Sequence, residues 1–206
     1  VRETCIHTAS VFVAYLGDAI PAAQTHEVLR LFIQRLQGES VRVSVMRGLE
    51  RIARSPLPLP FTEHLPALLP PLLHILTLGG GGRAAQVSAL TCLLAVLRNR
   101  NNRLEDSGLE QLVKGVAGAL GGEGFLGADV HVTSLALQIL LTLAQTYTSL
   151  SAPLIHTYAY TQLIGWVKSG GLAVGEVLDN ITQLLIHLVR HYVVSLDSVL
   201  STLGDI

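Results

Sequence analysis

Apolar residues recur at intervals of three and four along much of the chain, which is the spacing of one face of an α-helix. In one such run the apolar positions are Val41, Val45, Leu49 and Ile52. A half-buried strand would instead alternate apolar and polar residues. The pattern therefore predicts an all-α chain.

Four of the predicted helices begin alike, with a short opening followed by a run that has a small residue early and bulky aliphatic residues after it. The starts are 40, 41 and 48 residues apart. A fifth, looser copy begins at Val174. The four openings are Val1-Arg2, Val41-Arg42, Gly82-Arg83 and Val130-His131.

A second set of helical runs lies between these copies, so that helix, turn and helix repeat about every 40 residues. This period and the Val-Arg opening are typical of HEAT repeats. The sequence predicts an α-solenoid of HEAT-type helical hairpins, wound as a right-handed superhelical array. We expect residues 1–206 to form a single array of about five hairpins, with incomplete repeats at both ends. The second set spans 25–37, 62–78, 107–120, 152–169 and the start of another helix at 195–203.

Three helix starts carry a residue whose side-chain oxygen can accept a hydrogen bond from a first-turn amide. Thr62 precedes Glu63, and Ser107 precedes Glu110, which are expected N-terminal caps. Asp129 precedes the run that begins at Val130, and its charge also suits the positive end of the helix dipole.

Half of the residues are hydrophobic and 14% are charged, so the chain has enough apolar surface to fold. Residues 132–167 contain no Asp, Glu, Lys or Arg, which raises the question of a membrane span. Polar side chains on nearly every turn, and an interruption expected at Pro153, indicate helices packed between other helices instead. We therefore expect no membrane partner.

The formal net charge is −1, which does not favour nucleic acid as a partner. The charge is unevenly spread, however. Residues 1–103 carry 11 Arg and 6 Asp or Glu, and residues 104–206 carry 3 Lys or Arg and 9 Asp or Glu. This asymmetry suggests a partner of complementary charge, or two solvated faces of opposite sign.

Cys5 and Cys92 are too far apart in sequence to suggest a disulfide framework or a zinc motif. We expect both to be small core residues in a reducing compartment, the cytoplasm, the nucleus or both. The start at Val1, without an initiator Met, suggests a piece of a longer protein.

The sequence offers little enzyme chemistry. The segment 122–127 (GEGFLG) matches G-x-G-x-x-G, but a helix rather than a strand is expected before it, and no acid follows at the required distance. His187 and His191 have zincin spacing, but Leu188 stands where the catalytic Glu should be. We therefore expect no catalytic, cofactor or metal site and no small-molecule substrate.

Arginines provide the candidate binding surface. Arg47, Arg51 and Arg54 are spaced to share one helical face. An acidic protein or a phosphate could use this face. The alternative is a solvated surface partly paired with Glu50. Nucleic acid is disfavoured because aromatic residues do not interleave with the arginines. A basic loop adds Arg98, Arg100 and Arg103.

Four ordered segments carry a resemblance to a known family: VRETCIHTASVFVAYLGD, SVRVSVMRGLERIARSPLPL, VSALTCLLAVLRN and ADVHVTSLALQILLTLAQTYTSLS. They resemble the middle repeats of the cullin-associated, neddylation-dissociated proteins, from about residue 1 to about residue 170. The resemblance implies a non-enzymatic HEAT solenoid that wraps around unneddylated cullin–RING ubiquitin ligases and promotes exchange of their substrate receptors. The glycine-rich loops 79–82 and 121–127 depart from the family, and no contact residues transfer.

Two other functions remain open at this point. A tubulin-binding TOG domain is also a HEAT array of about this size, and it uses a Trp and basic residues in turns along one edge; here Trp166 falls within a helical run. A metal-dependent enzyme using His187 and His191 would need a third ligand that the sequence does not indicate.

Overall fold

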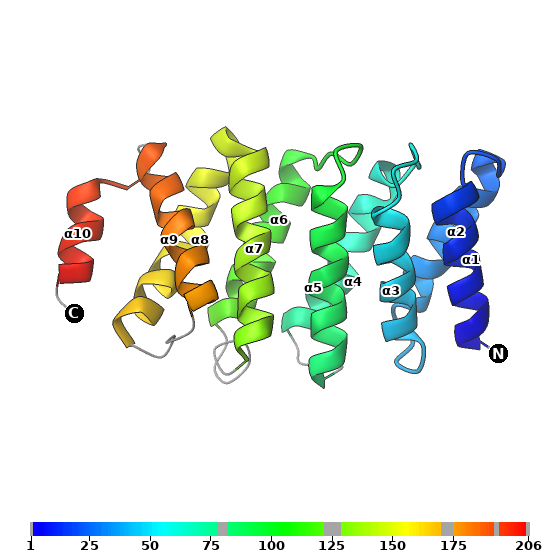
Figure 1. Ribbon diagram of the computed structural model, residues 1–206, viewed down its shortest axis with the longest axis horizontal. Coiled ribbons are helices and arrows are strands. Elements are labelled where there is room, and N and C mark those ends of the chain that lie inside the picture. Colours follow the sequence, from blue (N-terminus) through cyan, green and yellow to red (C-terminus); the bar gives the residue numbers. More distant parts are fainter. Residues whose placement is uncertain (1, 78–81, 122–128, 170–174, 192–193, 205–206) are drawn as a thin grey trace. The chain divides into compact units, whose positions relative to one another are not determined.

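The computed structural model describes residues 2–77, 82–121, 129–169, 175–191 and 194–204. Within these ranges the regular structure is helical, and no strand occurs. The prediction of an all-α fold is confirmed. The helices, shown in Figure 1, are α1 (Arg2–Leu16), α2 (Ala22–Arg35), α3 (Arg42–Ala53), the 3-10 turn η1 (Thr62–His64), α4 (Leu65–Thr77), α5 (Gly82–Arg98), α6 (Asp106–Gly121), α7 (Val130–Thr146), α8 (Thr148–Ser169), α9 (Gly175–Arg190) and α10 (Leu196–Gly204).

The chain divides into two compact units, Val1–Gly108 and Leu109–Ile206. In the first unit α3 lies between α1 and α5, and α2 and α4 form a second layer behind them (Figure 1). In the second unit α7 lies beside α9, while α8 contacts both of them and also α10. The helices that share the repeated opening thus form one layer of each unit, as expected for stacked helical hairpins.

Three of the four predicted apolar positions, Val45, Leu49 and Ile52, are buried in the core of the first unit. The fourth, Val41, is half-buried at the N-cap of α3. Packing is close at Gly48. A Cβ atom at this position would lie 2.9 Å from Cε2 of Phe32 and 3.3 Å from Cβ of Ser10. The sequence therefore has a glycine where α1, α2 and α3 meet, and a larger residue would push them apart.

The C-terminal ends of α1 and α3 are satisfied by side chains from the next repeat. A helix leaves its last four carbonyls without intrahelical donors. The Ser55 hydroxyl, just after α3, donates to the Ala14 carbonyl of α1 at 2.6 Å. In the same way Asn99, just after α5, donates through Nδ2 to the carbonyls of Ala53 at 2.7 Å and Ser55 at 3.2 Å. Neighbouring repeats are thereby joined at their ends as well as along their sides.

In the second unit α7 begins as predicted. The Asp129 carboxylate accepts hydrogen bonds from the backbone amides of His131 at 3.1 Å and Val132 at 3.3 Å. A polar contact then joins α7 to α9, where the Ser134 hydroxyl donates to Oε1 of Glu176 at 2.6 Å. Ser134 is buried, so this bond fixes the position of α7 relative to α9 along the helix axes.

Two predicted caps are wrong. Thr62 begins the 3-10 turn η1, and its hydroxyl donates to the backbone carbonyl of Asn101 at 3.2 Å. Ser107 lies inside α6, because the helix begins one residue earlier at Asp106, whose charge suits the positive end of the dipole. In both cases the pattern located the helix but not its first residue.

One of the two cysteine predictions is wrong. Cys92 is buried in α5 as expected, and burial raises the pKa of its thiol. Cys5 is exposed. The buried stripe of α1 runs through Ser10, Val13 and Ala14, and position 5 lies on a different side of the helix.

The long uncharged stretch at 132–167 is divided between α7 and α8. The division falls at Tyr147, where the backbone leaves the helical conformation (φ −120°, ψ 42°). The predicted interruption at Pro153 is wrong, since this proline lies inside α8. Among the described residues no helix is both long enough and apolar enough to cross a membrane.

Candidate functional site

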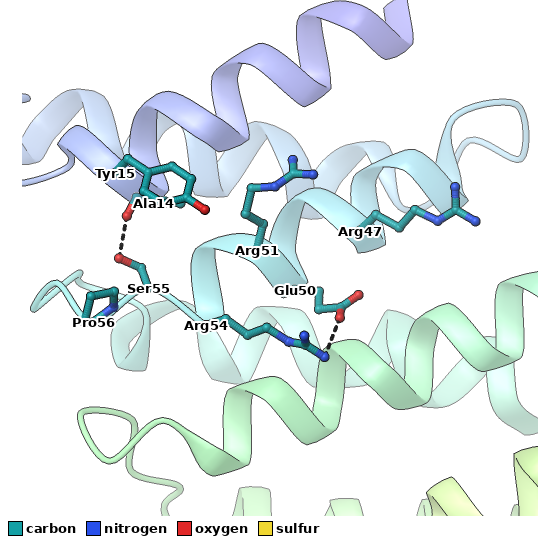
Figure 2. A pocket seen from close by; sticks show the side chains of 8 residues that line it. All are labelled: Ala14, Tyr15, Arg47, Glu50, Arg51, Arg54, Ser55 and Pro56. Atoms are coloured by element: carbon teal, nitrogen blue, oxygen red, sulfur yellow. Dashed lines mark hydrogen bonds and ion pairs between the residues drawn. The ribbon is translucent and has the colours of Figure 1, made fainter.

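A pocket of about 600 Å³ opens in the first unit at the C-terminal halves of α1 and α3. Figure 2 shows its side chains, which come from both helices and from the segment that follows α3. It contains all three arginines predicted on one face of α3. The lining residues are Ala14, Tyr15, Arg47, Glu50, Arg51, Arg54, Ser55 and Pro56.

The α-helical spacing explains why α3 presents these arginines together. Val45, Leu49 and Ile52 hold one side of the helix in the core, so Arg47, Arg51 and Arg54 project from another side. Arg47 and Arg54 are exposed and Arg51 is half-buried. All three line the same pocket, as their spacing predicts, although Arg54 is the C-cap residue that directly follows α3. Their use in binding remains a prediction.

The three arginines are engaged to different degrees. Arg54 forms an ion pair with Glu50 at 2.8 Å. Arg51 donates to the hydroxyl of Ser10 at 2.6 Å, and that hydroxyl itself donates to the His7 carbonyl at 2.7 Å. Arg47 has no hydrogen bond or ion pair within the part of the chain that the structure describes. Three guanidinium groups and one carboxylate leave the pocket with a formal charge of +2.

The expected pairing with Glu50 is thus confirmed for Arg54. This pair is one helical turn apart and largely solvent-accessible, with side-chain exposures of 66% for Arg54 and 21% for Glu50. Exposed pairs of this kind contribute at most about 1 kcal/mol to stability. The pair therefore orients Arg54 but neutralises a single arginine of the three.

The other wall of the pocket comes from α1, and the sequence did not indicate it. Tyr15 is 70% exposed and stands beside Ala14, whose carbonyl accepts the Ser55 bond (Figure 2). The signal that could have found it is the repeat interval. The bonds from Arg51 to Ser10 and from Ser55 to Ala14 each join residues 41 positions apart. One repeat length thus connects facing residues of α1 and α3.

The basic loop lies apart from this pocket. Arg98 ends α5, and Arg100 and Arg103 follow it; all three are exposed, and none lines the pocket in the described part of the chain. Asn99 nevertheless holds the start of this loop against the end of α3. The predicted arginine set is therefore divided into a pocket on α3 and a neighbouring exposed loop.

His187 lies in the last turn of α9 and His191 directly follows this helix, with the two ring centroids 4.5 Å apart. Desolvation lowers the pKa of His187, and the nearby His191 and Arg190 lower it further. Among the described residues no group of three His, Cys, Asp or Glu side chains is placed to hold a metal ion. The glycine motif at 122–127 lies outside the described residues, as do positions 79–81 of the other glycine run.

A second histidine pair links α2 to the turn before α4. Nδ1 of His26 and Nε2 of His64 are 2.9 Å apart, a hydrogen bond that requires at least one ring to be neutral at the shared position. Desolvation lowers the pKa of His64, the neighbouring His26 lowers it further, and Glu63 opposes both effects. The contact thus favours neutral His64.

This pair predicts a pH dependence of stability. The unfolded chain takes up a proton on His64 near the ordinary pKa of 6.5, but the folded chain does so at lower pH. The stabilisation from neutral His64 is complete above pH 6.5 and is lost as the pH falls towards the folded pKa. Urea unfolding at pH 8 and pH 5 should show a lower free energy of unfolding at pH 5. The variant His64→Gln should reduce that difference.

NMR titration supplies an independent check. The His64 ring should titrate below pH 6.5 in the native chain, and His26→Gln should move its pKa upwards by removing the neighbouring positive charge. A His64 ring that titrates above 6.5 in the folded chain would contradict the prediction.

No model of a known protein family matches the chain. A function must therefore be sought in the helical layers, in the pocket and in the resemblance carried by the ordered segments.

Proposed function

We propose that this chain is a non-catalytic scaffold that binds the core of cullin–RING ubiquitin ligases, the cullin with its RING subunit, in the cytoplasm or nucleus. It would act as the middle part of an exchange factor that regulates assembly of these ligases. The observation that carries the scaffold role is the positively charged pocket where two stacked repeats meet. The identity of the partner rests on the resemblance of the ordered segments.

The geometry suits protein binding better than catalysis. The pocket combines arginines, one carboxylate, an exposed tyrosine and a hydroxyl whose hydrogen bonds are internal. Catalysis of proton or acyl transfer needs a nucleophile or base held within reach of a reacting atom. Arginine stays protonated and serves instead to pair with carboxylates or phosphates. These side chains are equipped for recognition.

The proposal is tested by capture of a purified cullin–RING core on the immobilised chain. We expect the unmodified complex to be retained and the neddylated complex to be retained less, as the resemblance implies. The same resin should be challenged with tubulin in parallel. Failure to retain any unmodified cullin would reject the proposal, and retention of tubulin on the resin would support the TOG-type alternative.

No specific observation favours that alternative. Trp166 is half-buried within α8 rather than in a turn between helices. The enzyme alternative has its own measurement, which is the metal content of the purified chain. If the purified chain held one zinc ion bound through His187 and His191, the scaffold proposal would be rejected in favour of the enzyme alternative.

A further inference from the structure

We infer that the arginine-lined pocket binds an extended acidic segment of a protein partner, with carboxylates at alternate residues. This inference rests on the proposed function in one respect, that the partner is a protein. It adds which side chains bind, which chemistry they select and what conformation the bound segment adopts.

The spacing along α3 carries the first step. A helix rises about 1.5 Å per residue, so Arg47 and Arg51 are separated by about 6 Å along the axis. In an extended chain, alternate side chains point to the same side and lie about 6.6 Å apart. A Glu or Asp at each of two alternate positions therefore matches the spacing of Arg47 and Arg51.

The directions of the side chains favour two carboxylates over one phosphate. Figure 2 shows Arg47, Arg51 and Arg54 spread along α3 and its C-cap rather than pointing at a common centre, with Arg54 directed to Glu50. A single phosphate is best held by guanidinium groups that converge on it. A row of separated arginines fits a row of separated negative charges.

Arg47 and Arg51 are also the two arginines that a ligand can engage at small cost. Arg47 is exposed, with no ion pair or hydrogen bond to any described residue. Arg51 binds the neutral hydroxyl of Ser10, and a carboxylate is a stronger partner for a guanidinium. Ser10 would keep its bond to the His7 carbonyl when Arg51 leaves, so its buried hydroxyl remains satisfied. Arg54 stays with Glu50.

The test uses three fluorescein-labelled peptides and fluorescence anisotropy with the full chain. One peptide alternates Glu with Ala, the second has the same composition with its Glu residues clustered, and the third carries one phosphoserine among alanines. We expect the alternating peptide to bind most tightly. Tighter binding of the clustered or the phosphoserine peptide would overturn the inference.

Charge reversals then locate the site. Arg47→Glu and Arg51→Glu should each weaken the alternating peptide about tenfold. Arg35→Glu, an exposed reversal at the end of α2, is the matched control and should have a much smaller effect. Arg47→Glu removes no bond to a described residue, so far-UV circular dichroism should be unchanged. An equal loss in Arg35→Glu would show general charge attraction and overturn the inference.

The same variants separate this inference from the proposed function. If the double variant Arg47→Glu with Arg51→Glu captures the unmodified cullin–RING core as well as the native chain does, the pocket is not the partner site. The inference then fails while the proposed function stands. If the alternating peptide binds through Arg47 and Arg51 but no cullin is captured, the proposed function fails and the acidic specificity stands.

Discussion

Replacement of Gly48 by Leu should lower the free energy of unfolding by about 3 kcal/mol. Even the first side-chain carbon at this position would meet Phe32 of α2 at 2.9 Å and Ser10 of α1 at 3.3 Å. The remaining atoms of a leucine would have to separate three helices that are packed in the core. Urea unfolding followed by circular dichroism measures the loss.

Gly118→Leu is the matched control, because it places the same side chain in the interior of another helix. A Cβ atom there would have no neighbour within 4 Å, and the position is exposed. Leucine favours the helix over glycine, so this variant should be stabilised by about 0.5–1 kcal/mol. Equal destabilisation by the two substitutions would mean that α1, α2 and α3 do not approach closely at Gly48.

Asn99→Asp should lower the free energy of unfolding by about 2 kcal/mol. The native Nδ2 group donates to the carbonyls of Ala53 and Ser55 at the end of α3. In the variant a carboxylate oxygen would face two carbonyl oxygens, so both bonds would be lost and replaced by repulsion. The change in volume is negligible, and the effect therefore reports the hydrogen bonds rather than packing.

Asn101→Asp controls for the added negative charge. This residue is exposed, and its hydrogen bonds to the described part of the chain use backbone atoms: its carbonyl accepts from Thr62 and its amide donates to Asn99. We expect its free energy of unfolding to stay within about 0.5 kcal/mol of the native value. If Asn101→Asp were as destabilising as Asn99→Asp, charge in the loop and not the link to α3 would be responsible.

The positions of the helices were predictable because hydrophobic periodicity is a local signal that each repeat reproduces. The openings at Val41-Arg42, Gly82-Arg83 and Val130-His131 lie within one residue of the observed helix starts. Asp129 was identifiable as a cap because its effect is confined to the first helical turn. Boundaries that depend on tertiary contacts were not predictable, as at Thr62, whose hydroxyl binds a residue 39 positions away.

In the candidate site, too, the features set by local helical spacing were predictable and those set by tertiary contacts were not. The shared face of Arg47, Arg51 and Arg54 follows from the helical period alone. The wall supplied by Tyr15 and the bond between Arg51 and Ser10 depend on how two repeats stack. Hydrophobic periodicity does not determine which residues of neighbouring repeats face each other, although the repeat interval of about 40 residues indicates it. The separation of the basic loop from the pocket depends on the same stacking.

The hydrogen bonds from Ser55 and Asn99 run from a later repeat to the helix end of an earlier one. Each of these two side chains donates to a backbone carbonyl at the C-terminal end of a helix in the repeat before it. A ribosome that has synthesised α3 has therefore not yet produced the residue that satisfies its end. During synthesis the carbonyls of Ala53 and Ser55 must remain hydrated until Asn99, more than 40 residues later, has emerged, so that each repeat matures one repeat behind the growing chain.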